Sequence, residues 1–176
     1  MTRIRLLSLF GAAVALAAGT AFLQANRLQA QESAPLPAAQ KAPAWKLKDL
    51  DGHEVSAEQF KGKVVIVDFW ATWCGPCVGE IPNYVALQKK YGKDGLVVIG
   101  ALTHDPKTPA AVRAFADKLG MNYTIVVSND ATEEAFGGFE AIPTTFLISR
   151  DGRILHQKTG ALPADEYEKL VQSALK

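Results

Sequence analysis

Four runs of apolar residues stand out along the chain and predict the central strands. The run 64–67 is entirely β-branched and 96–99 is almost as apolar, which is typical of strands buried on both faces of a sheet. The runs 123–127 and 144–148 have the same character. Helical patterns separate the first three runs, so we expect a parallel arrangement there with right-handed crossovers.

The segments between these strands carry helix signals. A helix is expected over 74–91, directly after the first strand, and another over 109–119, where Thr108 can cap the start and Gly120 the end. A shorter helix should begin at about Asp130 as its cap and reach residue 136. An amphipathic helix over 163–175 closes the chain.

Two hairpins complete the prediction, each with an Asp-Gly turn. One joins 45–50 to 53–55 before the first central strand. The other joins 144–148 to 153–157 and adds antiparallel strands at an edge of the sheet. The predicted fold class is therefore α/β, with a mixed central sheet flanked by helices and an added N-terminal β-hairpin.

The first 30 residues follow a different pattern from the rest. Residues 1–5 carry two arginines, and 6–23 contain no charge. This is the layout of an export signal. The apolar run also approaches the ~17–25 residues that span a bilayer. We interpret 1–30 as a signal peptide or a membrane anchor through 6–23, which places the domain in the periplasm or another extracytoplasmic space.

A linker and one domain follow the export segment. Residues 31–44 contain three prolines among alanines, which predicts an extended tether, and 45–176 would form the folded domain. The formal net charge of the whole chain is +1, and no cluster of lysines or arginines is present. A nucleic-acid partner is therefore not expected.

The chain contains two cysteines, Cys74 and Cys77, separated by two residues. A disulfide between them closes too short a loop to stabilise a fold much, so the spacing favours redox chemistry over a structural role. A zinc site would need four ligands, but the chain has no second Cys-x-x-Cys and no paired histidines. We read His53, His104 and His156 as surface or hydrogen-bonding residues, and expect no metal and no cofactor.

The position of the cysteine pair predicts which thiol attacks. Disulfide exchange needs a thiolate, and an unperturbed cysteine has a pKa of ~8.5. The strand leads straight into a helix, so Cys74 lies at a helix N-terminus, where unpaired N–H groups favour an anion. We expect Cys74 to be the exposed attacker. Cys77 should be more buried and should resolve the mixed disulfide.

Two acidic residues lie close to this pair in the sequence. Asp68 ends an apolar strand, where it could exchange a proton with Cys77, or could instead reach solvent or cap a turn. Glu80 follows Cys77 by three residues, on the same side of the helix. From spacing alone, Glu80 could tune thiol acidity or could be solvated and incidental.

The segment Val67-Asp68-Phe69-Trp70-Ala71-Thr72-Trp73-Cys74-Gly75-Pro76-Cys77 resembles the active-site strand and helix start of the thioredoxin superfamily. The segment 141–146, Ala-Ile-Pro-Thr-Thr-Phe, resembles the part that carries the superfamily's cis-proline. The resemblance implies a thioredoxin fold, a cis Pro143 beside the cysteines, and substrate contacts at Trp73, Ile142 and Pro143.

Within the superfamily the chain is most similar to exported TlpA/ResA-like proteins. The export segment, the N-terminal hairpin and the pattern Cys74-x-x-Cys77-x-x-Glu80-x-Pro82 support this. The resemblance implies a reductant of protein disulfides, often serving cytochrome c maturation, that receives electrons from a membrane thiol–disulfide donor. It also implies that Glu80 modulates thiol acidity and substrate binding. Asp68 departs from many relatives, which carry Asn there.

Three other activities compete with a dithiol reductant. A net oxidant would use the same residues and differ only in reduction potential. A peroxide-reducing relative is less consistent with a resolving cysteine three residues away. A metal-handling module would use the dithiol as a soft ligand, for example for Cu(I).

Overall fold

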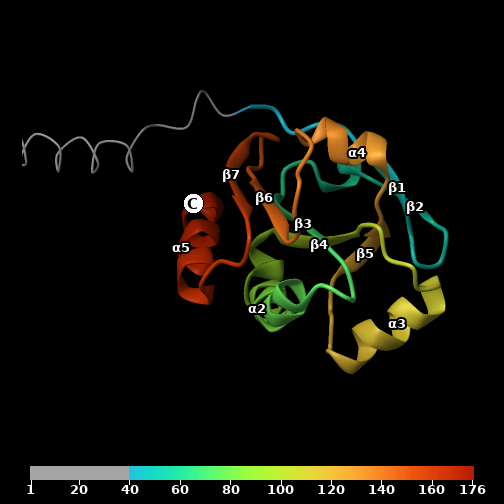
Figure 1. Cartoon of the computed structure of the whole chain (residues 1–176). Coiled ribbons are helices and arrows are strands. Elements are labelled where there is room, and N and C mark those ends of the chain that lie inside the picture. The colour runs from blue at the N-terminus through green and yellow to red at the C-terminus, as the bar shows by residue number, and fades with distance from the viewer. Residues whose placement is uncertain (1–39) are drawn as a thin grey trace, which may run out of the picture. The chain divides into compact units, whose positions relative to one another are not determined.

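The computed structural model describes residues 40–176 (Figure 1). The export segment, the apolar run 6–23 and residues 31–39 of the predicted tether lie outside the described residues. Within 40–176, seven strands form one sheet in the order β2-β1-β5-β4-β3-β6-β7. They are β1 (Lys46–Asp49), β2 (Glu54–Ser56), β3 (Val64–Trp70), β4 (Leu96–Leu102), β5 (Thr124–Val127), β6 (Thr144–Ile148) and β7 (Ile154–Thr159).

Strand pairing confirms the predicted mixed sheet. β4 pairs in parallel with both β3 and β5, while β6 and β7 continue the sheet antiparallel beyond β3. The N-terminal hairpin of β1 and β2 adds to the opposite edge through β5. β3 therefore lies inside the sheet, with a neighbour on each side. Among the described residues, no helix has the length and apolar character needed to cross a bilayer.

The helices begin and end close to the predicted positions. They are α2 (Gly75–Tyr91), α3 (Pro109–Lys118), α4 (Asp130–Ala135) and α5 (Ala164–Leu175), with short 3-10 turns η1 (Ala57–Phe60) and η2 (Gly92–Asp94). Thr108 caps α3 as predicted, since its hydroxyl accepts the Ala111 N–H. The cap of α4 is Asn129 and not Asp130. Asn129 has the extended backbone that a capping residue needs, and its side chain accepts the Thr132 N–H at 2.9 Å.

Alternate residues of β3 face two different packed layers. Val64 and Ile66 pack with Tyr84 of α2 and Tyr167 of α5. The intervening residues, Val65, Val67 and Phe69, pack on the other face with Phe136, at the end of α4, and with the aromatic ring of Phe146. Figure 1 shows α4 on the opposite side of the sheet from α2. This alternation is the two-residue period of a strand, and here both faces are apolar.

The folded part of the chain begins before Trp45. The Ile154 N–H donates to the Gln40 carbonyl at 2.8 Å, and the Ala42 N–H donates to the Gly152 carbonyl at 2.8 Å. Lys41 forms an isolated antiparallel bridge with Arg153. The end of the predicted tether is therefore paired with the β6–β7 hairpin. The prediction of a free tether is therefore wrong for residues 40–42, because extended backbone can also pair with a strand.

Candidate active site

The cysteines lie where β3 passes into α2. Cys74 is the capping residue of α2, and Cys77 lies in its first turn. Their sulfurs form a disulfide in this structure. The Cys77 N–H donates to the Cys74 sulfur at 3.3 Å, so a free backbone donor of the helix start points at that atom. The local sequence explains the placement, because Pro76 can occupy a helix start without losing a needed N–H donor.

The two cysteine residues differ less in solvent exposure than predicted. Cys77 is fully buried, as expected, but Cys74 is also only 5% exposed. The reason is the segment before β6, where the Ile142 carbonyl oxygen lies 3.7 Å from the Cys74 sulfur. The expected order of exposure therefore holds, while the expectation of an openly exposed Cys74 is wrong.

Asp68 is a buried carboxyl group on β3, only 1% exposed. The Thr145 hydroxyl donates to Asp68 Oδ1 at 3.2 Å. Burial and, to a lesser extent, the charge of Glu80 raise the pKa of Asp68 from 3.8 to about 8, against the Thr145 hydrogen bond, which lowers it. The alternative reading, in which Asp68 reaches solvent, is therefore wrong.

Strand β4, which neighbours Asp68 on one side of β3, supplies no positive charge to compensate the carboxylate. β3–β4 pairing places Asp68 opposite Gly100. A side chain there would collide with the buried Trp70 indole, because a Cβ would lie 2.8 Å from Trp70 Nε1. Glycine at this position makes room for the tryptophan and leaves the carboxyl without a cationic neighbour on β4. This absence fits the raised pKa of Asp68.

Glu80 is also buried, at 6% exposure. Its Oε1 accepts the Leu162 N–H at 2.9 Å, while Oε2 is buried without a hydrogen-bond partner among the described residues. Burial raises the pKa of Glu80, against the opposing effects of the Leu162 N–H and the charge of Lys158. The reading of Glu80 as a solvated, incidental acid is therefore wrong.

A hydroxyl network that the sequence did not reveal connects α2 to Asp68. Thr145 Oγ1 lies 3.2 Å from the Tyr84 hydroxyl, and both residues are buried. Tyr84 follows Cys77 and Glu80 along one face of α2, at spacings of seven and four residues. Burial raises the pKa of Tyr84 well above its usual range, so its hydroxyl stays protonated and can donate to Thr145. The face of α2 that carries Cys77 is thus linked to Asp68 through two hydroxyl groups.

The residues before β6 complete the surroundings of the disulfide. The Ile142–Pro143 peptide bond is cis. The Gly160 N–H donates to the Pro143 carbonyl at 2.8 Å, which holds this segment to the end of β7. The loop that follows contributes the Leu162 N–H to Glu80. One short loop therefore contacts both the proline segment and the buried glutamate.

Trp73 is 58% exposed beside the cysteines and is held by a loop that follows β4. Its indole N–H donates to the His104 carbonyl at 3.3 Å, and Asp105 Oδ2 accepts the Thr72 N–H at 2.6 Å. His104 has a φ of 45°, in the left-handed region that is uncommon for residues other than glycine. Sequence reasoning missed Asp105. A usable signal existed, because the carboxyl ends of neighbouring parallel strands meet at one edge of the sheet.

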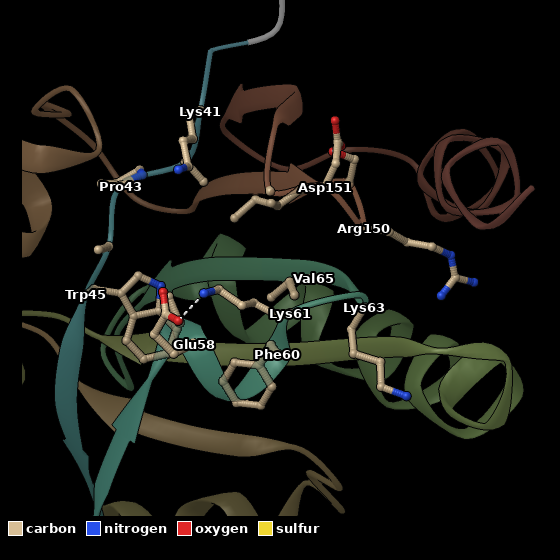
Figure 2. Close-up of a pocket in the computed structure, with 16 residues that line it drawn as sticks. Lys41, Pro43, Trp45, Glu58, Phe60, Lys61, Lys63, Val65, Arg150 and Asp151 are labelled. Atoms are coloured by element: carbon tan, nitrogen blue, oxygen red, sulfur yellow. Dashed lines mark hydrogen bonds and ion pairs between the residues drawn. The ribbon is translucent and has the colours of Figure 1, made fainter.

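One cavity lies apart from the cysteines. A cavity of about 590 Å³ adjoins the start of β3, at the end of that strand opposite Cys74, and is lined by Trp45, Phe60 and Val65 among others (Figure 2). Figure 2 shows Arg150 pointing away from this cavity. Its guanidinium binds the carbonyls of Gly62 and Asp94.

Two groups of side chains have oxygen and nitrogen atoms close enough to hold a cation. They are Asp49 with Asp51 and His53, and His104 with Asp130 and Glu133. Neither group includes a cysteine, and exposed acidic groups of this kind are common without an ion. The cysteine site itself has no additional thiolate or imidazole among the described residues that would complete a metal site.

Known proteins are similar to this chain in sequence and in fold. The sequence model of the Redoxin family matches residues 37–173. The thiol-disulfide oxidoreductase ResA of Geobacillus kaustophilus (strain HTA426) is 33% identical over 134 residues, which is 75% of each chain. The thioredoxin-like protein YneN of Bacillus subtilis (strain 168) is 35% identical over 130 residues, covering 74% of this chain and 76% of the relative.

The solved structures agree with these relatives. A thiol:disulfide interchange protein of the thioredoxin family from Chlorobium tepidum TLS superposes with a TM-score of 0.72 at 29% identity, over 80% of this chain and 99% of the other. The predicted thioredoxin-like fold is thereby confirmed. The chain belongs to the Redoxin family and is a ResA-like thiol-disulfide oxidoreductase with its redox pair at Cys74 and Cys77.

Proposed function

We propose that this enzyme is an extracytoplasmic reductant of protein disulfides, including disulfides formed during cytochrome c maturation. The observation that carries the proposal is the Cys74–Cys77 pair at the start of α2, beside a helix face that is linked to the buried carboxyl of Asp68. The positive and apolar segment 1–30 supports export. A membrane thiol–disulfide donor would return electrons to the enzyme.

The chemical steps follow from the arrangement of the pair. The Cys74 thiolate attacks one sulfur of the substrate disulfide, forming a mixed disulfide and releasing the other substrate sulfur as a thiolate, which takes up a proton. Cys77 then loses its proton and attacks the Cys74 sulfur. The Cys74–Cys77 disulfide forms, the second substrate thiolate leaves and is protonated, and two electrons have passed to the substrate.

Asp68 is suited to accept the Cys77 proton. An unperturbed thiol has a pKa of ~8.5, and proton transfer is most effective when donor and acceptor are closely matched. The pKa of Asp68, at about 8, meets this condition. The ionised fraction of Asp68, which grows as the pH rises towards 8, would take the proton as Cys77 attacks, and the protonated carboxyl would return it in the reverse reaction.

Glu80, Trp73, Ile142 and Pro143 have supporting roles in this proposal. Glu80 would modulate the acidity of the pair through its nearby buried charge. Trp73 and the backbone of Ile142 would contact an extended substrate, because the Ile142 carbonyl contacts the Cys74 sulfur and Trp73 is the exposed residue before Cys74. Pro143 would fix the segment that presents Ile142.

Trapping tests the proposal directly. Cys77→Ser should accumulate mixed disulfides between Cys74 and substrate proteins in cells, whereas Cys74→Ser should abolish exchange. Equal reactivity of both thiols, or turnover in Cys74→Ser, would refute these roles. The direction is tested by equilibrating the pure protein with dithiothreitol. A potential as high as that of a strong oxidant, ~−120 mV, would contradict a reductant.

A further inference from the structure

A cavity of about 510 Å³ is lined by Trp73, which precedes Cys74 in the sequence, and by Ile142, which contacts the Cys74 sulfur. Trp73, Phe139 and Ile142 give it apolar walls, and His104, Glu133 and Glu140 give it polar ones. Ile142 lines the cavity and also places its carbonyl oxygen 3.7 Å from the Cys74 sulfur. A polypeptide whose disulfide reaches Cys74 would therefore pass over this cavity.

The polar wall is acidic, and part of it is held in place. Thr103 donates its hydroxyl hydrogen to Glu133 Oε1, and His104 Nε2 lies 3.3 Å from Glu133 Oε2. The Glu133 side chain is only 13% exposed, so its carboxylate has little freedom to turn away. Glu140 is exposed on the same cavity. Among the described residues that line the cavity there is no lysine or arginine.

The segment that carries Glu140 is anchored to the core. The Phe139 ring lies 4.6 Å from the Phe69 ring, measured between centroids. Gly137 and Gly138 both have positive φ, at 101° and 61°, which lets the chain turn sharply between α4 and Phe139. The anchored ring fixes the backbone on either side of it. Glu140 is thus presented on the cavity by a positioned segment.

We propose that this cavity binds a lysine or arginine side chain of the substrate polypeptide, close in sequence to the substrate disulfide. The long alkyl stem of such a side chain would lie along Trp73 and Phe139, with its charged end at the two carboxylates. This proposal rests on the proposed function, because it assigns a recognition site for the same disulfide-containing substrates. It makes Glu133 and Glu140 determinants of specificity.

Paired peptides test the proposal. Each peptide has one intramolecular disulfide, and the two members of a pair differ only by lysine or glutamine at one position near a cysteine. The pre-reduced full-length enzyme is used in buffer with EDTA, because His104, Asp130 and Glu133 could otherwise bind a cation. At one or two positions, lysine should raise the second-order rate constant for oxidation of the enzyme by the peptide by about twofold to fivefold, as expected for a partly exposed charge pair. The preference should weaken as salt is raised.

Variants connect the preference to the cavity. Glu140→Gln should reduce it, and Glu133→Gln with Glu140→Gln should abolish it. Glu134→Gln removes a neighbouring charge of α4 that does not line the cavity, and should keep the preference. Equal rates for every peptide pair would overturn the proposal. So would a preference that survives the double substitution, or one that is lost equally in Glu134→Gln.

A neutral small disulfide distinguishes failure of the cation site from failure of the proposed reductase function. Hydroxyethyl disulfide is too small to need the cavity. If the wild-type enzyme reduces neither hydroxyethyl disulfide nor any peptide, the proposed function fails. If it reduces hydroxyethyl disulfide and all peptides without regard to charge, the reductase activity stands and the cation site is refuted.

Discussion

The two halves of β3 are both buried but have different functions. Val64–Val67 carry only apolar side chains, which pack into the layers on both faces of the sheet. The second half begins with Asp68, a carboxyl group with 1% exposure. Burial stabilises the first half and penalises the charge in the second. Burial therefore sets the proton affinity of Asp68, while burial of Val64–Val67 holds the sheet together.

The largest expected difference between the halves is in the pH dependence of stability. Below about pH 4, Asp68 is protonated in both the folded and the unfolded chain, so it has no effect. Between about pH 4 and pH 8 the folded protein retains a proton that the unfolded chain has released. As the pH rises through this window, the free energy of unfolding should therefore fall by about 1.4 kcal/mol per pH unit.

Asp68→Asn removes this contribution and should be more stable than wild type near pH 8. Urea unfolding of the oxidised protein measures it, since the paired cysteines do not titrate. Glu80 adds a slope of the same sign to both proteins, so the difference between the two curves is the relevant quantity. Parallel curves from pH 4 to pH 8 would show that Asp68 has an ordinary pKa.

Substitution in the apolar half of β3 should destabilise the protein, in contrast to Asp68→Asn. Ile66→Ala should lower the free energy of unfolding by about 2–5 kcal/mol, because it leaves a cavity at a fully buried position. Ile66→Val, the matched smaller change, should cost about 0.5–1.5 kcal/mol. The exchange rate of the folded fraction should stay at the wild-type value. A large loss of exchange rate without loss of stability would mean that the two halves are not separable.

Substitution of Thr145, in the hydroxyl network, should affect both stability and the pKa of Asp68. Thr145→Val removes the hydrogen bond to Asp68 and the partner of Tyr84, and should cost about 1–3 kcal/mol of stability. It should also raise the pKa of Asp68 further, which moves the upper end of the pH window above about pH 8. Tyr84→Phe leaves the Asp68 hydrogen bond in place and should cost less. If the upper end of this pH range is unchanged in Thr145→Val, Thr145 does not influence the pKa of Asp68.

Much of this site was predictable because it is local in sequence. One stretch, residues 64 to 91, contains the strand, the helix start, Cys74, Cys77, Asp68 and Glu80. Within it, the spacing of residues along a strand or helix determines which face each side chain occupies. The Thr145 contacts were not predictable, since they join residues 77 and 61 positions apart. Alternation along a strand tells which face a side chain takes, but not which residue of another strand lies opposite.

The same limit explains the errors. Cys74 was expected to be exposed because it was assigned the attacking role at the helix start, and the segment whose carbonyl contacts it lies 68 residues away. The solvated alternative for Glu80 failed because the Leu162 N–H comes from a loop 82 residues further on. At the start of α4, two adjacent residues can both cap a helix, and sequence alone could not choose Asn129 over Asp130.

The proposed role of Asp68 is to accept the Cys77 proton when Cys77 resolves the mixed disulfide. The direct measurement is the rate at which a preformed mixed disulfide on Cys74 is resolved, followed by stopped flow in wild type and Asp68→Asn. Loss of a general base should slow this step by about a hundredfold, more than it slows the first attack by Cys74. Resolution at the wild-type rate in Asp68→Asn would contradict the claim.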